Sequence, residues 1–469
     1  MMSMNKYKTL IKDTSIFAIG SIASKAIVFF LVPLYTNCLS ADEYGIADLV
    51  FTIAQLVVPF VSLVIFDGVI RFGLERRERP QDALLIGCVV WFIGSAVTIA
   101  LSIFVNFYTA INEWKVYLAL YVIENVLLSI ELNYLKVIDK NVIYAISSVV
   151  QTAILALMNI VLLVFFEMGV QGYLLANIVS QLVAIILTGF FGNLISELRK
   201  AKWDTILAKE MIKYSSPLVL NNLSWWVVQS SDKVMIEKMI TASALGVYTV
   251  ACKIPSLINV FVSVFQQAWG LSSIREVDSS NDNRFYANVL ETVYFLTCFG
   301  CLGLLIIIKP FMEVYARGDG YEDAWTLVPL LLVSAVFSAV AAYFGSMYGA
   351  LKKSVNNMNT TLIAAILNIV VNYFAIELLG VIGAVIGTFA SYMVLAIIRM
   401  VDVNKYIEVP INTSKFVCNA VIIIITAILI TCKINIYVNS CMAMIIFLVI
   451  NRDFINKIIR MKKRGSING

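Results

Sequence analysis

Three lysines within apolar stretches are the residues of this sequence best suited to bind a ligand. Lys25, Lys233 and Lys253 each lie inside a run long enough to cross a membrane. A charge at the centre of a bilayer costs about 2.5–3.5 kcal/mol on insertion scales, so it normally faces a hydrated cavity or an oppositely charged partner. Three cations in such surroundings predict a cavity that accepts a negatively charged substrate.

Polar residues at helical spacing predict the surfaces that line this cavity. Asp48, Thr52 and Gln55 share one face of a helix, and similar stripes run along the other lysine-bearing segments. Alternatively, such polar side chains only join neighbouring membrane helices by hydrogen bonds. We expect the cavity to be lined by Lys25, Lys233, Lys253, Asp48, Gln55, Asn222, Trp226, Gln229, Ser256 and Gln267.

Two carboxylates are candidates for ion coupling. Glu124 and Glu131 are seven residues apart, which places them on one face of a helix, two turns from each other. They could bind a coupling proton or Na⁺, pair with a cavity lysine, or have a purely structural role.

The composition requires a membrane protein. Hydrophobic residues make up 60% of the 469 residues and charged residues only 14%, which a soluble protein of this size could not accommodate. The period and length of the apolar stretches predict helices rather than strands of a membrane barrel. We expect an all-α protein with about fourteen spans, near 14–36, 44–68, 83–108, 114–135, 142–166, 170–195, 214–238, 243–270, 285–308, 324–348, 358–377, 381–400, 416–432 and 436–451.

Several kinds of chemistry find no support in the sequence. There is no histidine, and the eight cysteines are scattered mostly within the apolar stretches. Phosphate-cradling and dinucleotide-binding glycine motifs are absent. No soluble domain fits between the spans. We therefore expect no enzyme activity, no catalytic residues, no metal, no cofactor and no nucleic-acid partner.

The distribution of basic residues predicts the topology. Of the 35 Lys and Arg residues, 27 fall on one side of the predicted spans, five on the other and three within them. Because basic connections remain in the cytoplasm, both termini are predicted to be cytoplasmic and the number of spans even. The basic segment from Asn451 to Arg464 is expected to lie on anionic lipid headgroups.

The sequence also contains an internal repeat. Tyr44-Gly45-Ile46 recurs as Leu245-Gly246-Val247 at an offset of 201, and residues 169–172 recur at 380–383. Six spans return the chain to the same side of the membrane, so the two copies are parallel, an arrangement typical of transporters with a substrate site between the halves. We expect a six-helix lobe over residues 1–200, a second over 201–411, a central cavity, and two further helices with the basic tail over 412–469.

Short motifs at the start of each half resemble one protein family. They lie at residues 33–35 and 39–49 and, in the second half, at 214–219, 222–226, 231–233 and 245–248. They are similar to those of the Wzx-type O-antigen, capsule and exopolysaccharide flippases of the multidrug/oligosaccharidyl-lipid/polysaccharide (MOP) superfamily. Members that move the lipid-linked cell-wall precursor carry cavity cations on the first and eighth helices, which Lys25 and Lys253 match in helix and in type.

The resemblance implies a function and a location. The expected substrate is an undecaprenyl-diphosphate-linked oligosaccharide, moved to the outer leaflet of the bacterial inner membrane by alternating access. Expected partners are this lipid, the membrane lipids, and a polysaccharide polymerase or glycosyltransferases. Two alternatives stay open at this stage. One is a multidrug and toxin extrusion (MATE)-like antiporter, whose cavity should be acidic, and the other is a membrane polymerase or glycosyltransferase, which would carry a sizeable loop or catalytic segment.

Overall fold

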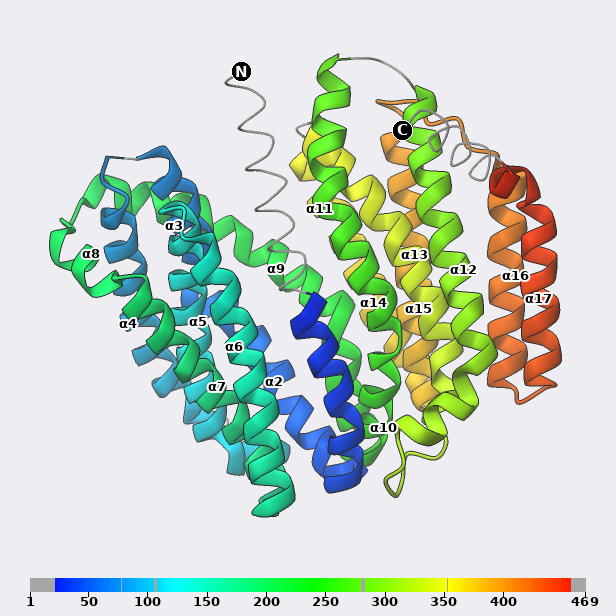
Figure 1. The fold of residues 1–469 in the computed structure, drawn as a ribbon, viewed down its shortest axis with the longest axis horizontal. Coiled ribbons are helices and arrows are strands. Elements are labelled where there is room, and N and C mark those ends of the chain that lie inside the picture. Colours follow the sequence, from blue (N-terminus) through cyan, green and yellow to red (C-terminus); the bar gives the residue numbers. More distant parts are fainter. Residues whose placement is uncertain (1–21, 77, 105–107, 280–282, 352, 457–469) are drawn as a thin grey trace, which may run out of the picture. The chain divides into compact units, whose positions relative to one another are not determined.

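The part of the chain that the computed structural model describes is helical throughout, without a strand. It comprises residues 22–76, 78–104, 108–279, 283–351 and 353–456 (Figure 1). After an unlabelled first helix, Ile22–Cys38, the elements are α2 (Ala41–Ser62), α3 (Ile65–Glu75), α4 (Gln81–Ser102), η2 (Thr109–Trp114), α5 (Lys115–Val137), α6 (Asn141–Asn159), η3 (Ile160–Phe165), α7 (Gly169–Phe191), α8 (Leu194–Lys200), α9 (Thr205–Met239), α10 (Ala242–Lys253), α11 (Pro255–Ser279), α12 (Asn283–Tyr315), α13 (Ala324–Ala350), α14 (Ser354–Leu379), α15 (Val381–Val403), α16 (Thr413–Thr431) and α17 (Ile436–Ile450).

The predicted spans coincide with helices, and the all-α membrane fold is confirmed. Within the described residues, ten helices are long and apolar enough to cross a membrane alone, and α10 with α11 adds a bent pair. Two shorter apolar helices, Ile22–Cys38 and α17, match the first and last predicted spans. The remaining predicted span, 214–238, lies inside the 35-residue α9, which is more polar than the others. The first eight residues of the span predicted at 14–36 lie outside the described residues.

The second predicted span, 44–68, is not one continuous helix. Ser40 caps the start of α2, and its backbone and that of Glu43 exchange hydrogen bonds with each other's side chains. The helix ends where Leu63 and Val64 adopt left-handed φ angles of 50° and 54°, and α3 continues beyond them. The Ser62 hydroxyl accepts a hydrogen bond from the Val64 backbone N–H at 3.1 Å, which offers the backbone an alternative to helical pairing.

The eighth predicted span, 243–270, is also broken. Helix α10 ends at Lys253, and α11 starts at Pro255 with the axis turned by 45°. A proline disfavours helical geometry at the preceding residue, here Ile254, and lacks the N–H that would continue the ladder. The sequence therefore places Lys253 at the end of a helix in the middle of a span.

The described helices form two compact units. The first contains residues up to Val250 together with Ala316–Tyr321, and the second contains Ala251–Tyr315 and the residues from Glu322 onward. By spatial contact α9 and most of α10 belong to the first unit, whereas the internal repeat begins the second lobe at residue 201. The lobe boundaries at residues 200 and 411 stay predictions, because packing and duplication divide a chain by different criteria.

Candidate functional site

In the first unit, two of the predicted polar stripes lie side by side. Helices α2 and α9 pack against each other in antiparallel directions. The Lys233 ammonium of α9 contacts Asp48 of α2. One turn further along α2, the Thr52 carbonyl accepts a hydrogen bond from the Trp226 indole N–H of α9 at 2.9 Å. The predicted stripes are thus the surfaces through which these two helices recognise each other over at least two turns.

Asp48 is the centre of a buried polar cluster. Its Oδ2 accepts hydrogen bonds from Lys233 Nζ at 2.7 Å and from the Thr249 hydroxyl of α10 at 3.1 Å. The side chains of Lys233 and Asp48 are only 17% and 10% exposed. A buried charge is tolerated when it is paired and hydrogen-bonded. In this conformation the Lys233 charge is therefore offset by Asp48.

A second polar group adjoins this cluster and lies outside the predicted set of cavity residues. The buried Asp232 accepts a hydrogen bond from the Tyr248 hydroxyl of α10, and its Oδ1 accepts the Lys233 backbone N–H at 2.9 Å. Near the same end of α9, Glu237 accepts from the Tyr108 hydroxyl. The only sequence signal was the run of charged residues at the end of α9, which does not reveal the partners.

The two glycines of the internal repeat face each other in the structure. A methyl group added to Gly45 would lie 2.0 Å from the Ala242 carbonyl oxygen, and one added to Gly246 would lie 1.9 Å from the Ala41 carbonyl oxygen. Ala41 and Ala242 are themselves related by the offset of 201, as are Asp48 and Thr249. Helices α2 and α10 therefore meet through equivalent residues of the two copies. Only glycine allows so close a backbone approach.

The other predicted cavity residues differ in exposure. Lys25, Gln55 and Gln229 are exposed and lie on the Ile22–Cys38 helix, α2 and α9, respectively. Asn222 and Trp226 are partly buried, and the Asn222 amide donates to the Leu218 carbonyl of its own helix at 3.0 Å.

Lys253 and Ser256 lie on either side of the break between α10 and α11. The Ser256 hydroxyl donates to the Lys253 carbonyl, and both residues are partly buried. A cation at the last residue of a helix is favoured by the partial negative charge of the free carbonyls there. Gln267 belongs to α11, and its side chain lies outside the described residues.

Both candidate coupling carboxylates belong to α5, which packs against α7. The Glu131 carboxylate accepts a hydrogen bond from Thr188 of α7. Nearer the start of α5, the Asn125 amide donates to the Gln181 side chain of α7 at 3.2 Å. Glu124 Oε2 is buried without a hydrogen-bond partner in the described part of the chain. Neither glutamate forms an ion pair there, so pairing with a cavity lysine is not observed.

The burial of one cation was not predicted from the sequence. Arg399 is one of the 27 basic residues predicted on the cytoplasmic side, and in the structure it lies in α15 and is 1% exposed. Its guanidinium donates to the Ala341 carbonyl at 2.8 Å, to the Asn357 amide oxygen at 2.5 Å and to the Thr361 hydroxyl at 2.9 Å. These bonds join α13, α14 and α15 of the second unit, which is a structural role.

Within the described residues, no group of three His, Cys, Asp or Glu side chains is arranged to hold a metal ion. The observed clusters consist of lysine–carboxylate, hydroxyl–carboxylate and amide pairs. Such groups can bind and release charged ligands or protons.

Sequence comparison identifies relatives in both bacteria and archaea. The chain is 22% identical over 271 residues to a membrane protein of Haemophilus influenzae, and the match spans 64% of that relative's length. It is 21% identical over 452 residues, covering 91% of each chain, to the "Probable low-salt glycan biosynthesis flippase Agl15" of Haloferax volcanii.

The fold is shared with solved transporters of the MOP superfamily. The lipid II flippase MurJ in an inward closed conformation aligns over 94% of this chain and 99% of its own, with a TM-score of 0.72 and 13% identity. An inward-facing MATE family multidrug transporter aligns over 83% and 94%, with a TM-score of 0.70 and 14% identity. At these identities the matches establish the fold alone. They agree with the predicted resemblance to flippases of this superfamily.

The family model described as "Polysaccharide biosynthesis protein" matches residues 36–324, more than half of the chain. This range includes α2, α9 and α10, the helices that carry the Asp48 cluster and the facing glycines. The chain is a multi-pass membrane protein that belongs to the polysaccharide biosynthesis protein family.

Proposed function

We propose that the protein is a flippase that moves an undecaprenyl-diphosphate-linked oligosaccharide from the cytoplasmic to the outer leaflet during surface polysaccharide biosynthesis. The observation that carries this proposal is the placement of lysines at membrane depth in a member of this family. Lys25 is exposed on a membrane helix, and Lys253 lies at a helix break. A relative described as a glycan biosynthesis flippase supports the class of substrate.

The chemistry of the substrate explains the need for these cations. A diphosphate that crosses an apolar interior loses its hydration, and only nearby positive charges can offset that loss. In this conformation Asp48 offsets the Lys233 charge, and Lys25 and Lys253 are the other two cations that we propose for binding the diphosphate. The amides of Gln55, Asn222 and Gln229 and the Trp226 ring are suited to contact the sugars.

The contact between α2 and α10 suggests how access could alternate. Both helices begin at this contact, on the side that the charge distribution predicts to be outer. We propose that the facing glycines and the Asp48–Lys233–Thr249 cluster close the outer gate. Opening the gate separates α2 from α9 and α10 and releases Lys233 from Asp48, which makes the Lys233 charge available to the diphosphate.

A charge series at the lysines tests the substrate proposal. Lys25, Lys233 and Lys253 are each replaced by Ala, Glu and Arg, and surface-polysaccharide export is measured by complementation together with membrane protein levels. Loss of a charge-assisted hydrogen bond costs roughly 1.5–3 kcal/mol, so Ala should reduce export about tenfold or more. Glu should abolish export through repulsion, and Arg should preserve it better than Ala.

Lys405 provides the matched control, because its side chain is 65% exposed at the end of α15 and pairs only locally with Asp402. Its replacement by Glu should leave export unchanged. Export that survives Lys25→Glu and Lys253→Glu at normal protein abundance would refute the anion-binding role.

We propose Glu124 or Glu131 as the ion-coupling residue. Glu124 is the stronger candidate, because its buried Oε2 has no hydrogen-bond partner in the described residues, whereas Glu131 is held by Thr188. Glu124→Gln should remove the dependence of export on an imposed pH or Na⁺ gradient. Unchanged gradient dependence in both Glu124→Gln and Glu131→Gln would make these residues structural.

The proposed location is the inner membrane with both termini in the cytoplasm. Reporter fusions at Gly320 and Asn439 should report the outer face, and fusions at Lys353 and Gly469 the inner face. An outer signal at Lys353 would contradict this topology. Polymerases or glycosyltransferases that handle the same lipid are the proposed protein partners.

A MATE-like antiporter is the second candidate, because the MATE fold aligns with a similar TM-score, 0.70 against 0.72 for MurJ, although over a smaller share of this chain. Such a protein would bind cationic drugs. The export assay separates the two functions, since drug resistance that depends on Asp48, with no effect of the lysine series on polysaccharide, would favour the antiporter.

A further inference from the structure

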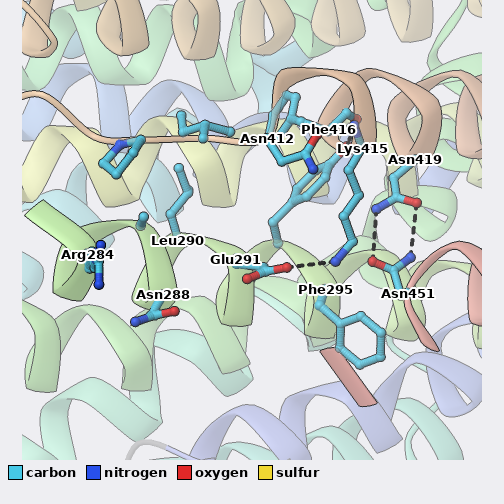
Figure 2. A pocket seen from close by; sticks show the side chains of 14 residues that line it. Arg284, Asn288, Leu290, Glu291, Phe295, Asn412, Lys415, Phe416, Asn419 and Asn451 are labelled. Atoms are coloured by element: carbon cyan, nitrogen blue, oxygen red, sulfur yellow. Dashed lines mark hydrogen bonds and ion pairs between the residues drawn. The ribbon is translucent and has the colours of Figure 1, made fainter. Parts of the chain in front are cut away.

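A pocket in the second unit is lined by none of the three lysines and by no residue of the predicted polar stripes. It has a volume of about 450 Å³, within the roughly 300–1,000 Å³ typical of small-molecule sites. Figure 2 shows Arg284 and Asn288 at one end of the pocket, the Glu291–Lys415 pair in the middle, and Asn419 with Asn451 at the other end. The walls come from α12, from the segment 410–412, from the start of α16 and from Asn451 directly after the end of α17.

The pocket lies where three membrane helices end on the same face. Helices α12 and α16 begin here, at Asn283 and Thr413, and α17 ends here at Ile450. The spans Arg284–Tyr315 and Thr413–Thr431 are both apolar enough to cross a membrane. The pocket is therefore at the boundary between the hydrocarbon and the headgroups, on the side that carries most of the Lys and Arg residues.

The pocket is held together by specific contacts. Asn419 and Asn451 exchange two amide hydrogen bonds, of 3.1 and 3.3 Å, which join α16 to the end of α17. The Tyr294 ring stacks on Phe416 with 4.1 Å between ring centroids, and its hydroxyl donates to the Phe416 carbonyl at 3.0 Å. Phe295 lies against Phe447 and Phe454. These contacts fix the three helices around a preformed space.

The lining is suited to a molecule that is anionic at one end and apolar at the other. The lining contains two basic residues: Lys415 donates to the Glu291 carboxylate at 2.7 Å in the middle of the pocket, and Arg284 lies at its end (Figure 2). The first turns of α12 and α16 add the partial positive charge of helix N-termini, which favours phosphate groups. Apolar walls lie beside these groups and are formed by Leu290, Tyr294, Phe295, Pro410, Ile411 and Phe416.

We propose that this pocket binds the headgroup of an anionic glycerophospholipid from the surrounding leaflet. The phosphate lies toward Arg284, Asn288 and the start of α12, and the glycerol and first methylene groups lie along the aromatic walls. The bound lipid fastens α16 and α17 to α12. The occupant is a bulk membrane lipid and not the transported substrate, because the pocket lies at the membrane surface and its main cation is at the rim.

Lipid binding to the purified full-length protein tests the proposal. The protein in detergent is titrated with phosphatidylglycerol or phosphatidylcholine, and bound lipid is counted by native mass spectrometry. Arg284→Gln removes the rim cation, and Asn288→Asp adds a repelling charge at an exposed position. Each should weaken phosphatidylglycerol binding about fivefold, as expected for one basic residue at a membrane surface.

Lys405→Gln is the matched control, because it removes an exposed cation outside the pocket on the same predicted face. It should change binding less than twofold. Arg284 and Asn288 are exposed on the first turns of α12, so the variants are expected to fold, which size-exclusion profiles verify. Equal retention of phosphatidylcholine, equal losses in Lys405→Gln, or displacement of phosphatidylglycerol by a polyprenyl diphosphate would each overturn the proposal.

Discussion

Replacement of Asp48 by Asn tests the buried cluster between α2, α9 and α10. Asn keeps the size of the side chain and can still accept a hydrogen bond from Thr249, but it leaves the Lys233 ammonium without its countercharge. The pair is short, at 2.7 Å, and its side chains are only 17% and 10% exposed. Loss of one partner of a buried ion pair costs about 3–5 kcal/mol.

The same substitution at an exposed pair provides the control. Lys433 and Asp323 lie 2.8 Å apart, but their side chains are 57% and 73% exposed. Exposed pairs contribute roughly 0–1 kcal/mol, so Asp323→Asn should change the stability little. The two pairs have nearly the same geometry and differ mainly in burial, which makes burial the variable that is tested.

Thermal unfolding of the purified protein in detergent measures the effect. Asp48→Asn should lower the melting temperature markedly, and Asp323→Asn should leave it nearly unchanged. The double variant Asp48→Asn/Lys233→Met should recover most of the loss, because it removes the buried lysine charge as well. If Asp48→Asn costs no more than Asp323→Asn, or if the double variant is less stable than the single one, the buried ion pair is not the stabilising element described here.

Three further predictions concern other parts of the structure. Gly246→Ala should lower the melting temperature, because the new methyl group would lie 1.9 Å from the Ala41 carbonyl oxygen. The control Gly303→Ala in α12, where the methyl group meets open space, should be neutral or stabilising by up to about 1 kcal/mol. Equal effects of the two substitutions would contradict the close contact. The pKa of Asp204, the N-cap of α9, is held below its usual value by the Leu207 backbone N–H and by Arg76. The Asp204 charge therefore stabilises the fold above the ordinary carboxyl pKa, and this contribution is lost as the pH falls through the lowered pKa. Asp204→Asn should reduce the melting temperature at pH 7 and match the wild type in strong acid, and a difference that persists in acid would argue against the role of the charge. Arg399→Lys should lower the free energy of unfolding by about 3 kcal/mol or more, because a lysine cannot replace the guanidinium hydrogen bonds to α13 and α14. The control Arg452→Lys, at a side chain that is 77% exposed, should leave the stability unchanged. Comparable melting temperatures of the two variants would refute the structural role of Arg399.

The positions of the helices could be predicted from the sequence, because apolar length alone decides which segments cross a membrane. The stripes on α2 and α9 were also predictable, since their spacing follows the helical period. The two helix breaks were harder to anticipate. Pro255 signals one of them, but the left-handed turn at Leu63 and Val64 depends on a local hydrogen bond from Ser62 that no composition rule reveals.

The partners of the buried charges could not be predicted, because they depend on how distant helices pack. The sequence placed Asp48 on a polar stripe but did not identify its partner, and the packing of α2 against α9 pairs it with Lys233. Arg399 appeared to be a surface residue because it lies near the end of an apolar stretch. Its burial follows from Gly345 of α13, where an added methyl would lie 2.5 Å from Nη1, so the missing side chain makes room for the guanidinium.

Transport by the purified protein tests the central proposal most directly. The protein is reconstituted into vesicles that carry a fluorescent undecaprenyl-diphosphate-linked oligosaccharide, and the fraction of sugar accessible on each face is followed over time. The proposed function predicts movement of the covalently unchanged lipid to the opposite leaflet, and loss of this movement in Lys253→Glu but not in Lys405→Glu. Movement no faster than in protein-free vesicles, or a sugar chain that has been lengthened or cleaved, would contradict it.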